Sequence, residues 1–327
     1  MALIKTNARG QSSNLGRRNL IINGAMQVSQ RGTDINDIAN DSTYIVDRFL
    51  TRDYGGDGTY DYDQSTDVPT ATFKNSLKLT CKSASTNTGT YGYSIEQKIE
   101  GYNIRQLRLG RSNAQPITVS FWVKSSVAGT YSTGLRTSSA EYSYVTEFAL
   151  LANTWKYVTY TAPALTTSLS QLSEGSGGGL IVDLVCLGKQ TSKTTSTLNA
   201  WQSGNYVFSN NQVAWSDNAN ATLNVTGVQL EVGDTATDFE HRSYGEELAL
   251  CQRYYERTGT IYTMDYGSSH SLFPHVYNVV KRATPTAVLT GFGSGTVSGT
   301  GDVHSNYVYR PNNQAANSGE AFYDAEI

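Results

Sequence analysis

The sequence predicts an all-β protein in which a β-sandwich is followed by a short helical connector and a smaller C-terminal β domain. Three observations support this fold class. Residues 19–240 contain many short segments in which apolar and polar residues alternate, the period of a strand with one buried face. Turns rich in Gly, Asn, Ser and Thr separate these segments, and helical periodicity is almost absent. A length of 327 residues allows one large β domain and a second, smaller one.

Residues 1–18 form the first predicted element. They are polar, contain Gly10 and Gly16, and show no sustained period. This composition is typical of a disordered tail. It also fits an attachment arm that becomes ordered only on docking to another subunit.

Residues 19–33 predict the opening hairpin of a large domain that spans residues 19–240. A short apolar strand leads into an Asn23-Gly24 turn, after which Met26 and Val28 alternate with polar residues. No catalytic chemistry needs this pattern, so the hairpin is a structural prediction.

Further strands of the large domain follow from alternating or continuous apolar segments. They are expected at residues 77–81, 117–124, 131–135, 142–150, 155–161, 180–187 and 221–231. Val119, Phe121 and Val123 share one face of their strand and should point into the core. Many short strands at this spacing indicate a β-sandwich.

Residues 241–252 are predicted to be a short helical connector. Ser243 and Glu246 fit the S-x-x-E capping box, and the helix is expected from Glu246 to Tyr254 as a spacer. Residues 253–327 then form a small β domain, with strands near 260–263, 286–290 and 306–309 and an exposed glycine-rich loop at 291–301. A unit of this size should pack against the large domain or against copies of itself.

Composition excludes several classes of function. Charged residues make up 16% of the chain and the net charge is −3, so we expect no nucleic-acid partner. Three distant cysteines without a C-x-x-C pair predict buried thiols rather than disulfides or a zinc site. No secretory apolar region and no apolar run of about 20 residues occur, so neither a signal peptide nor membrane insertion is expected.

Known catalytic motifs are absent from the sequence, and its four histidines are scattered. We therefore expect a protein with no enzymatic activity, no catalytic residues and no cofactor. A host-polysaccharide hydrolase stays as the alternative, because a glycosidase needs only two suitably separated carboxylates.

An acidic segment between residues 53 and 67 contains five aspartates. Asp57, Asp61 and Asp63 are weak candidates for a structural calcium site. Their spacing does not match an EF-hand, however, and the neighbouring glycines are typical of a solvated loop. No metal site is therefore assigned.

Sugar binding is the chemistry that the sequence favours. Aromatic rings stack on the C–H faces of sugars, while amides, carboxylates and ammonium groups bind the hydroxyls. Trp122 and Lys124 should face away from the core, as should Asp183 on its own strand. Trp201 and Trp215, in polar loop-like sequence, are further candidate platforms or interface anchors. Trp155 is expected in the core.

Several segments together resemble one family of proteins. "NLIINGAMQVSQRGT…YIVDRF" (residues 19–49) resembles the start of bacteriophage virion proteins built on a carbohydrate-binding-module-like jelly roll. Residues 120–125, 129–131 and 155–159 are similar to the middle of that jelly roll. Residues 227–233 and 236–242 look like its closing strand, and residues 247–255 and 281–286 look like the segments that follow it. The resemblance covers roughly residues 19–290.

The resemblance implies a jelly-roll β-sandwich in a tail-fibre or receptor-binding subunit that attaches to host surface glycans. Residues 1–18 would contact other virion proteins, the chain would form a homotrimer, and it would be located in the virion. A capsid-decoration or head-fibre protein is the alternative. No ligand residue is transferred from the family, because no family-wide ligand motif matches here.

Overall fold

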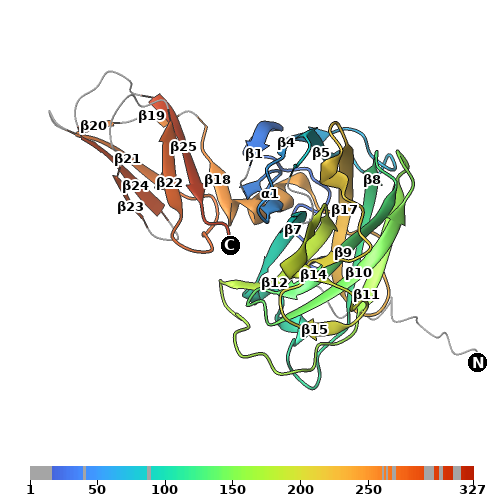
Figure 1. The fold of residues 1–327 in the computed structure, drawn as a ribbon. Helices are drawn as coiled ribbons and strands as arrows, with labels where there is room; N and C mark the ends of the chain where they lie inside the picture. Colours follow the sequence, from blue (N-terminus) through green and yellow to red (C-terminus); the bar gives the residue numbers. More distant parts are fainter. Residues whose placement is uncertain are drawn as a thin grey trace, which may run out of the picture.

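The structure is a computed structural model that describes residues 17–39, 42–86, 90–259, 261–262, 264–266, 270–290, 298–301, 305–311 and 318–327. The predicted arm, except for its last two residues, and most of the glycine-rich loop at 291–301 lie outside these ranges. The regular structure of the described part consists of β-strands with one α-helix and short 3₁₀ turns, which confirms the predicted all-β fold class (Figure 1).

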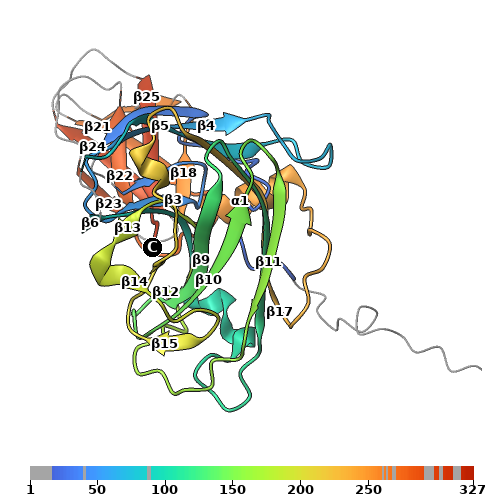
Figure 2. The ribbon, with the colours of Figure 1, turned by 45° about the vertical axis from the view of Figure 1, so that its right-hand side comes forward.

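Two antiparallel sheets form the large sandwich (Figures 1 and 2). The six-stranded sheet has the order β1 (Asp34–Ala39), β4 (Thr59–Ser65), β5 (Ser76–Ser83), β17 (Thr222–Val232), β8 (Ile117–Ser125) and β11 (Lys156–Ala162). The seven-stranded sheet has the order β15 (Trp201–Ser203), β10 (Tyr142–Leu150), β9 (Gly129–Thr137), β12 (Gly178–Cys186), β7 (Tyr93–Glu100), β3 (Leu50–Asp53) and β2 (Thr43–Tyr44).

Shorter elements connect the strands of the sandwich. β6 (Thr90–Tyr91) pairs with β13 (Lys189–Gln190), and β14 (Thr194–Thr195) pairs in parallel with β16 (Phe208–Ser209). Single turns of 3₁₀ helix occur at Gly101–Asn103, Arg105–Leu107, Thr191–Lys193 and Trp215–Asp217.

Apolar side chains from both sheets meet in one core. β8 shows how alternation produces it: Val119, Phe121 and Val123 are fully buried, while Trp122 and Lys124 lie on the opposite, partly exposed face. The orientation predicted for this strand is therefore confirmed. The three cysteines are also buried free thiols, as expected, and burial raises the pKa of Cys81 to about 11.

The predicted opening hairpin is wrong. Residues 19–29 form no strand, although the chain turns at Asn23 and Gly24. Instead the segment runs buried beside β17, where the amide of Leu20 donates to the carbonyl of Leu230 and the amide of Val228 donates to the carbonyl of Gly24. Its apolar residues enter the core rather than pairing with each other, because they are covered on several sides.

The helix α1 (Tyr244–Gln252) confirms the predicted capping box. Ser243 is the N-cap; its hydroxyl accepts from the amide of Glu246, whose carboxylate accepts from the amide of Ser243. The helix is more than a spacer, because Cys251 and the adjoining Tyr254 pack against Ile22 and Val28 of the buried N-terminal segment.

The C-terminal strands form two small sheets. One contains β18 (Tyr255–Arg257), β25 (Ser318–Asp324), β19 (Ile261–Tyr262) and β22 (Thr286–Thr290), and the other contains β20 (Met264–Tyr266), β21 (His270–Val276), β24 (Ser305–Pro311) and β23 (Ser298–Gly301). They lie beside the sandwich (Figure 1). The described part of the chain contains no helix with the length and apolar character that a bilayer crossing requires.

Candidate functional site

An aromatic groove of about 590 Å³ lies on the outer face of the six-stranded sheet. Its lining residues come from β8, β11, the β17 bulge, the β4–β5 loop and the segment between β17 and α1: Thr70, Thr72, Phe73, Ser120, Trp122, Tyr157, Gly227, Ala236, Thr237, Asp238, Phe239 and His241. Of the five side chains predicted to bind glycan, only Trp122 lines this groove.

The floor of the groove is an aromatic pair across two strands. Trp122 on β8 stands directly opposite Tyr157 on β11, and their ring centroids are 5.2 Å apart. Both side chains point away from the core because each alternates with buried residues along its strand. Tyr157 is 41% exposed, so part of this aromatic surface is open to solvent.

A second aromatic cluster forms the wall. Phe73 and Phe239 lie 5.2 Å apart between ring centroids, and His241 lies 4.8 Å from Phe239. Phe73 is buried and His241 is exposed. The wall therefore joins the β4–β5 loop to the segment that follows β17.

Gly227 makes the junction of floor and wall sterically possible. It lies at the bulge where the pairing of β17 with β8 shifts, and its φ is 64°. A Cβ atom there would lie 2.7 Å from the Phe73 ring and 3.2 Å from Trp122. Glycine is therefore required both by the left-handed backbone and by the close approach of the rings.

Lys124 lies beside the groove in a separate cluster with Asp67 and Trp155. Its ammonium group forms an ion pair with the Asp67 carboxylate and lies 5.3 Å from the centroid of the Trp155 ring. The Trp155 indole donates to Asp67 over 3.1 Å. The hydrogen bond from Lys124 lowers the pKa of Asp67. Trp155 is partly exposed rather than in the core, so the prediction for Trp155 is wrong.

Asp183 does not lie on an exposed face. It belongs to the other sheet and is 1% exposed, and the Arg136 guanidinium binds it over 2.6 and 2.8 Å. Arg136 also pairs with Glu96 over 2.7 Å. Burial alone would lower the pKa of Arg136, but Asp183 raises it well above its ordinary value.

The other two tryptophans predicted to bind glycan pack against neighbouring parts of the protein. Trp215 is 0% exposed and stacks near Tyr60, with ring centroids 6.4 Å apart. Trp201 packs on Tyr144, and its indole donates to the carbonyl of Pro163 over 2.6 Å. Neither side chain lines the groove.

The aspartates considered for calcium bind protein donors at separate places. Asp57 accepts from the amide of Thr86, Asp61 accepts from the amide of Asp37, and Asp63 pairs with Lys78 over 3.3 Å. In the described ranges no group of three or more His, Cys, Asp or Glu side chains is placed to hold a metal ion.

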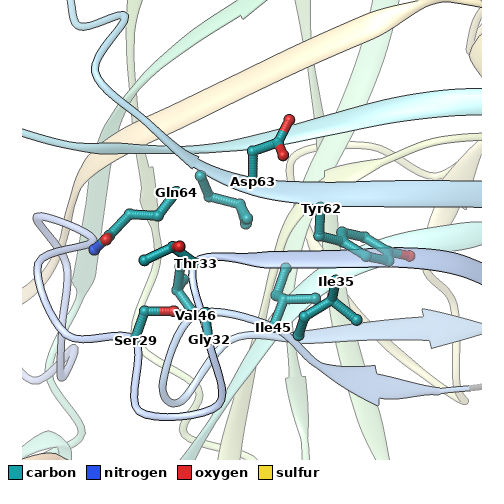
Figure 3. Close-up of a pocket in the computed structure, with 10 residues that line it drawn as sticks. Ser29, Gly32, Thr33, Ile35, Ile45, Val46, Tyr62, Asp63 and Gln64 are labelled. Carbon is teal, nitrogen blue, oxygen red and sulfur yellow. Dashed lines mark hydrogen bonds between the residues drawn. The ribbon is translucent and has the colours of Figure 1, made fainter.

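Two other hollows are less suitable for a sugar. One, lined by residues that include Ile35, Tyr62 and Gln64, has a volume of about 10 Å³, which is enough for about one water molecule (Figure 3). The other is a cleft of about 410 Å³ at the edge of the sandwich, between β10 and β11. Phe148 and Tyr160 line it, but these rings also pack within the core.

Sequence reasoning found one groove residue and missed most of the others. Phe73, Phe239 and His241 lie in irregular segments, where no strand period indicates the direction of a side chain. The signal that was available is the alternation in residues 155–161: Val158 is buried, so Tyr157 must face outward beside Trp122.

No family model and no curated protein matches the sequence. Solved structures give weak similarities. A proposed sugar-binding protein from Bacteroides thetaiotaomicron aligns with 14% identity and a TM-score of 0.36, covering 65% of this chain and 99% of its own. A family 11 carbohydrate-binding module of a Clostridium thermocellum cellulase aligns with 10% identity and a TM-score of 0.30, covering 64% of this chain and 99% of its own.

A carbohydrate-binding module in complex with β-1,4-galactotriose aligns with 10% identity and a TM-score of 0.28, covering 56% of this chain and 88% of its own. All three TM-scores lie below 0.5. These similarities therefore carry no weight in assigning a family or a ligand to this chain.

Proposed function

We propose that this protein is a non-enzymatic glycan-binding protein and that the aromatic groove on the six-stranded sheet is its binding site. The observation that carries the proposal is the exposed Trp122–Tyr157 pair, which forms the floor of a groove with a second aromatic wall. Contiguous exposed aromatic surface rimmed by polar residues is typical of a ligand-binding groove.

The groove has the chemistry that sugar recognition requires. Aromatic floor and wall offer π-faces to the C–H groups of a pyranose ring. The exposed Thr70 and Thr72 hydroxyls and the Asp238 carboxylate lie among the lining residues. The two hydroxyls bond to each other over 2.6 Å and keep further hydrogen-bonding capacity, so these three groups can bind sugar hydroxyls. Its volume of about 590 Å³ falls within the range of small-molecule sites, roughly 300–1,000 Å³.

A glycan array followed by titration calorimetry tests the proposal. The wild type should bind a defined set of glycans, and Trp122→Ala should weaken that binding by about tenfold or more. Tyr102→Ala is the matched control, because Tyr102 is 53% exposed and does not line the groove. Absence of array binding, or equal affinity of Trp122→Ala and wild type, would remove the proposed site.

The same groove favours binding over hydrolysis. Within the described part of the chain, Asp238 is the only carboxylate that lines the groove, whereas a glycosidase of the common type uses two. Incubation of the purified protein with the glycans that it binds should leave their length unchanged in chromatography. Shortened products would support the alternative, a polysaccharide hydrolase.

The sequence resemblance supports a further proposal about location. The chain would be a homotrimeric tail-fibre or receptor-binding subunit of a phage virion, attached through residues 1–18, and several weak sites on one particle would act together. Antibody labelling of intact particles should mark the tail. Label on the capsid would favour a decoration or head-fibre protein, and sedimentation should give three times the chain mass of 35.6 kDa.

A further inference from the structure

We propose that the binding surface continues from the groove to Trp155, so that the site takes an extended, neutral glycan chain on two adjacent aromatic platforms rather than a single sugar. The first platform is the Trp122–Tyr157 pair and the second is the Trp155 ring. This inference rests on the proposed glycan-binding function and adds the class of ligand.

The register of β8 and β11 places the two platforms in line. Tyr157 pairs with Trp122 and Lys156 pairs with Val123, so in this antiparallel pair position 155 continues opposite Lys124. The contact between Lys124 and the Trp155 ring agrees with that register. Residues two apart on one strand face lie about 7 Å from each other. The two platforms are therefore neighbours on one face of the sheet, close enough to contact different sugars of one chain.

The Trp155 ring is held in place before any ligand arrives. Its indole N–H donates to Asp67 and its face meets the Lys124 ammonium group. Both partners come from elements that also build the groove: Lys124 follows Trp122 on β8, and Asp67 lies close before Thr70 in the same connection from β4 to β5. A ring fixed in this way loses little conformational entropy when a sugar stacks on it.

The charges around the two platforms indicate a neutral chain. Lys124 and Asp67 neutralise each other, and no Lys or Arg is among the described residues that line the groove. An anionic polysaccharide would therefore find no unpaired cation in the groove to offset its desolvation. The ionised Asp67, whose pKa the hydrogen bond from Lys124 lowers, is an acceptor for sugar hydroxyls next to Trp155.

Chain-length dependence of binding tests the second platform. Cello-oligosaccharides and chito-oligosaccharides of two to six units serve as neutral probes, and oligogalacturonides of the same lengths as anionic probes, in titration calorimetry. Affinity for at least one neutral series should rise from two units to four or more. Trp155→Ala should remove this rise, about 3- to 10-fold.

Two variants separate a binding role of Trp155 from a purely structural one. Trp155→Phe keeps an aromatic face but loses the N–H bond to Asp67, and it should keep most of the length-dependent gain. Trp122→Ala should weaken every length. Thermal unfolding of each variant checks that the fold is intact.

The outcomes distinguish this inference from the proposed function. If array glycans bind and depend on Trp122, but affinity is independent of length or of Trp155, the second platform is overturned and the groove stands. Preference for oligogalacturonides, or no binding of either neutral series, also overturns the extended neutral chain. If no glycan binds at all, the proposed function itself fails.

Discussion

At the scale of single residues, two asparagines hold the buried N-terminal segment in place. The Asn19 amide donates to the carbonyl of Val228 and its oxygen accepts from the amides of Ile21 and Leu230. The Asn23 side chain bonds in the same way to the backbone of Val28 and Asp47. These bonds satisfy backbone groups that no strand ladder reaches, which explains why the segment is ordered without secondary structure.

Gly24 provides a residue-scale prediction. A Cβ atom at this position would lie 2.1 Å from the carbonyl oxygen of Val228, which is backbone and cannot move aside alone. Gly24→Ala should therefore lower the free energy of unfolding by about 1–3 kcal/mol in chemical denaturation.

Gly245 in the exposed first turn of α1 is the matched control, because no atom lies within 4 Å of the added Cβ. Gly245→Ala should leave the free energy of unfolding unchanged or raise it by up to about 1 kcal/mol. An equal loss in both variants would refute the steric argument.

At the residue scale, the sequence predicted side-chain exposure correctly where a strand sets the direction of the side chain. The prediction failed where a distant segment of the chain covers the outward face of a strand. The alternation of apolar and polar residues correctly predicted that Trp122 on β8 faces outward. The same alternation predicted that Asp183 faces away from Val182 and Leu184 and is exposed, but all three residues are buried. Asp183 pairs with Arg136, whose guanidinium also donates to Asn205 in the distant segment between β15 and β16. Burial by a segment that is distant in the sequence cannot be predicted from the local alternation of apolar and polar residues.

At the scale of elements, one carboxylate joins two loops of the sandwich by hydrogen bonds. Glu141, in the turn between β9 and β10, accepts from the amides of Ser170 and Gln171 in the connection from β11 to β12. The hydrogen bond from the Ser170 hydroxyl is the main reason that the pKa of Glu141 falls to about 2. This contact fixes two loops at one end of the sandwich.

The Glu141 contact should depend on pH. Its folded pKa lies below the ordinary value of 4.5, so its stabilisation is complete above about pH 4.5 and is lost as pH falls through 2. Carboxyl NMR titration should give a Glu141 pKa near 2 in the wild type and a value closer to 4.5 in Ser170→Ala. Ser168→Ala, two residues away, should not change it; an ordinary pKa in the wild type would disprove the contact.

Element prediction worked best for strands with one buried face. The segments predicted at 117–124, 142–150 and 221–231 match β8, β10 and β17 within one or two residues. The hairpin prediction for residues 19–33 was wrong because an irregular segment buried in a core can show the same alternation of apolar residues beside an Asn-Gly turn. Its partners, β17 and α1, lie more than 200 residues away in the sequence.

At the scale of the whole molecule, ionic contacts join the C-terminal strands to the sandwich. Arg48 is 1% exposed; it pairs with Glu326 and lies 3.6 Å from the centre of the Tyr254 ring. Arg31 stacks at 3.6 Å on Tyr255 and pairs with Asp324 over 3.2 Å. Arg31 and Arg48, both within residues 19–49, therefore lie at the junction of the two β units.

Arg48→Ala tests this junction. The substitution removes the nearer of the two charge partners of the buried Glu326 carboxylate and leaves Arg31 at 3.5 Å, so the loss of unfolding free energy should be up to about 3–5 kcal/mol. Amide hydrogen exchange should accelerate first in β25 and α1. Arg257→Ala removes an exposed ion pair with Glu320 and should cost less than about 1 kcal/mol. Similar losses in the two variants would mean that the buried contact does not hold the units together.

The central claim is that a glycan binds over Trp122 and Tyr157, and a crystal structure with the tightest array glycan tests it most directly. The account predicts a sugar ring stacked on this aromatic pair, with its hydroxyls bonded to exposed groove residues such as Thr72 or Asp238. A sugar bound instead in the cleft between β10 and β11, or on the C-terminal strands, with an empty groove, would contradict the account.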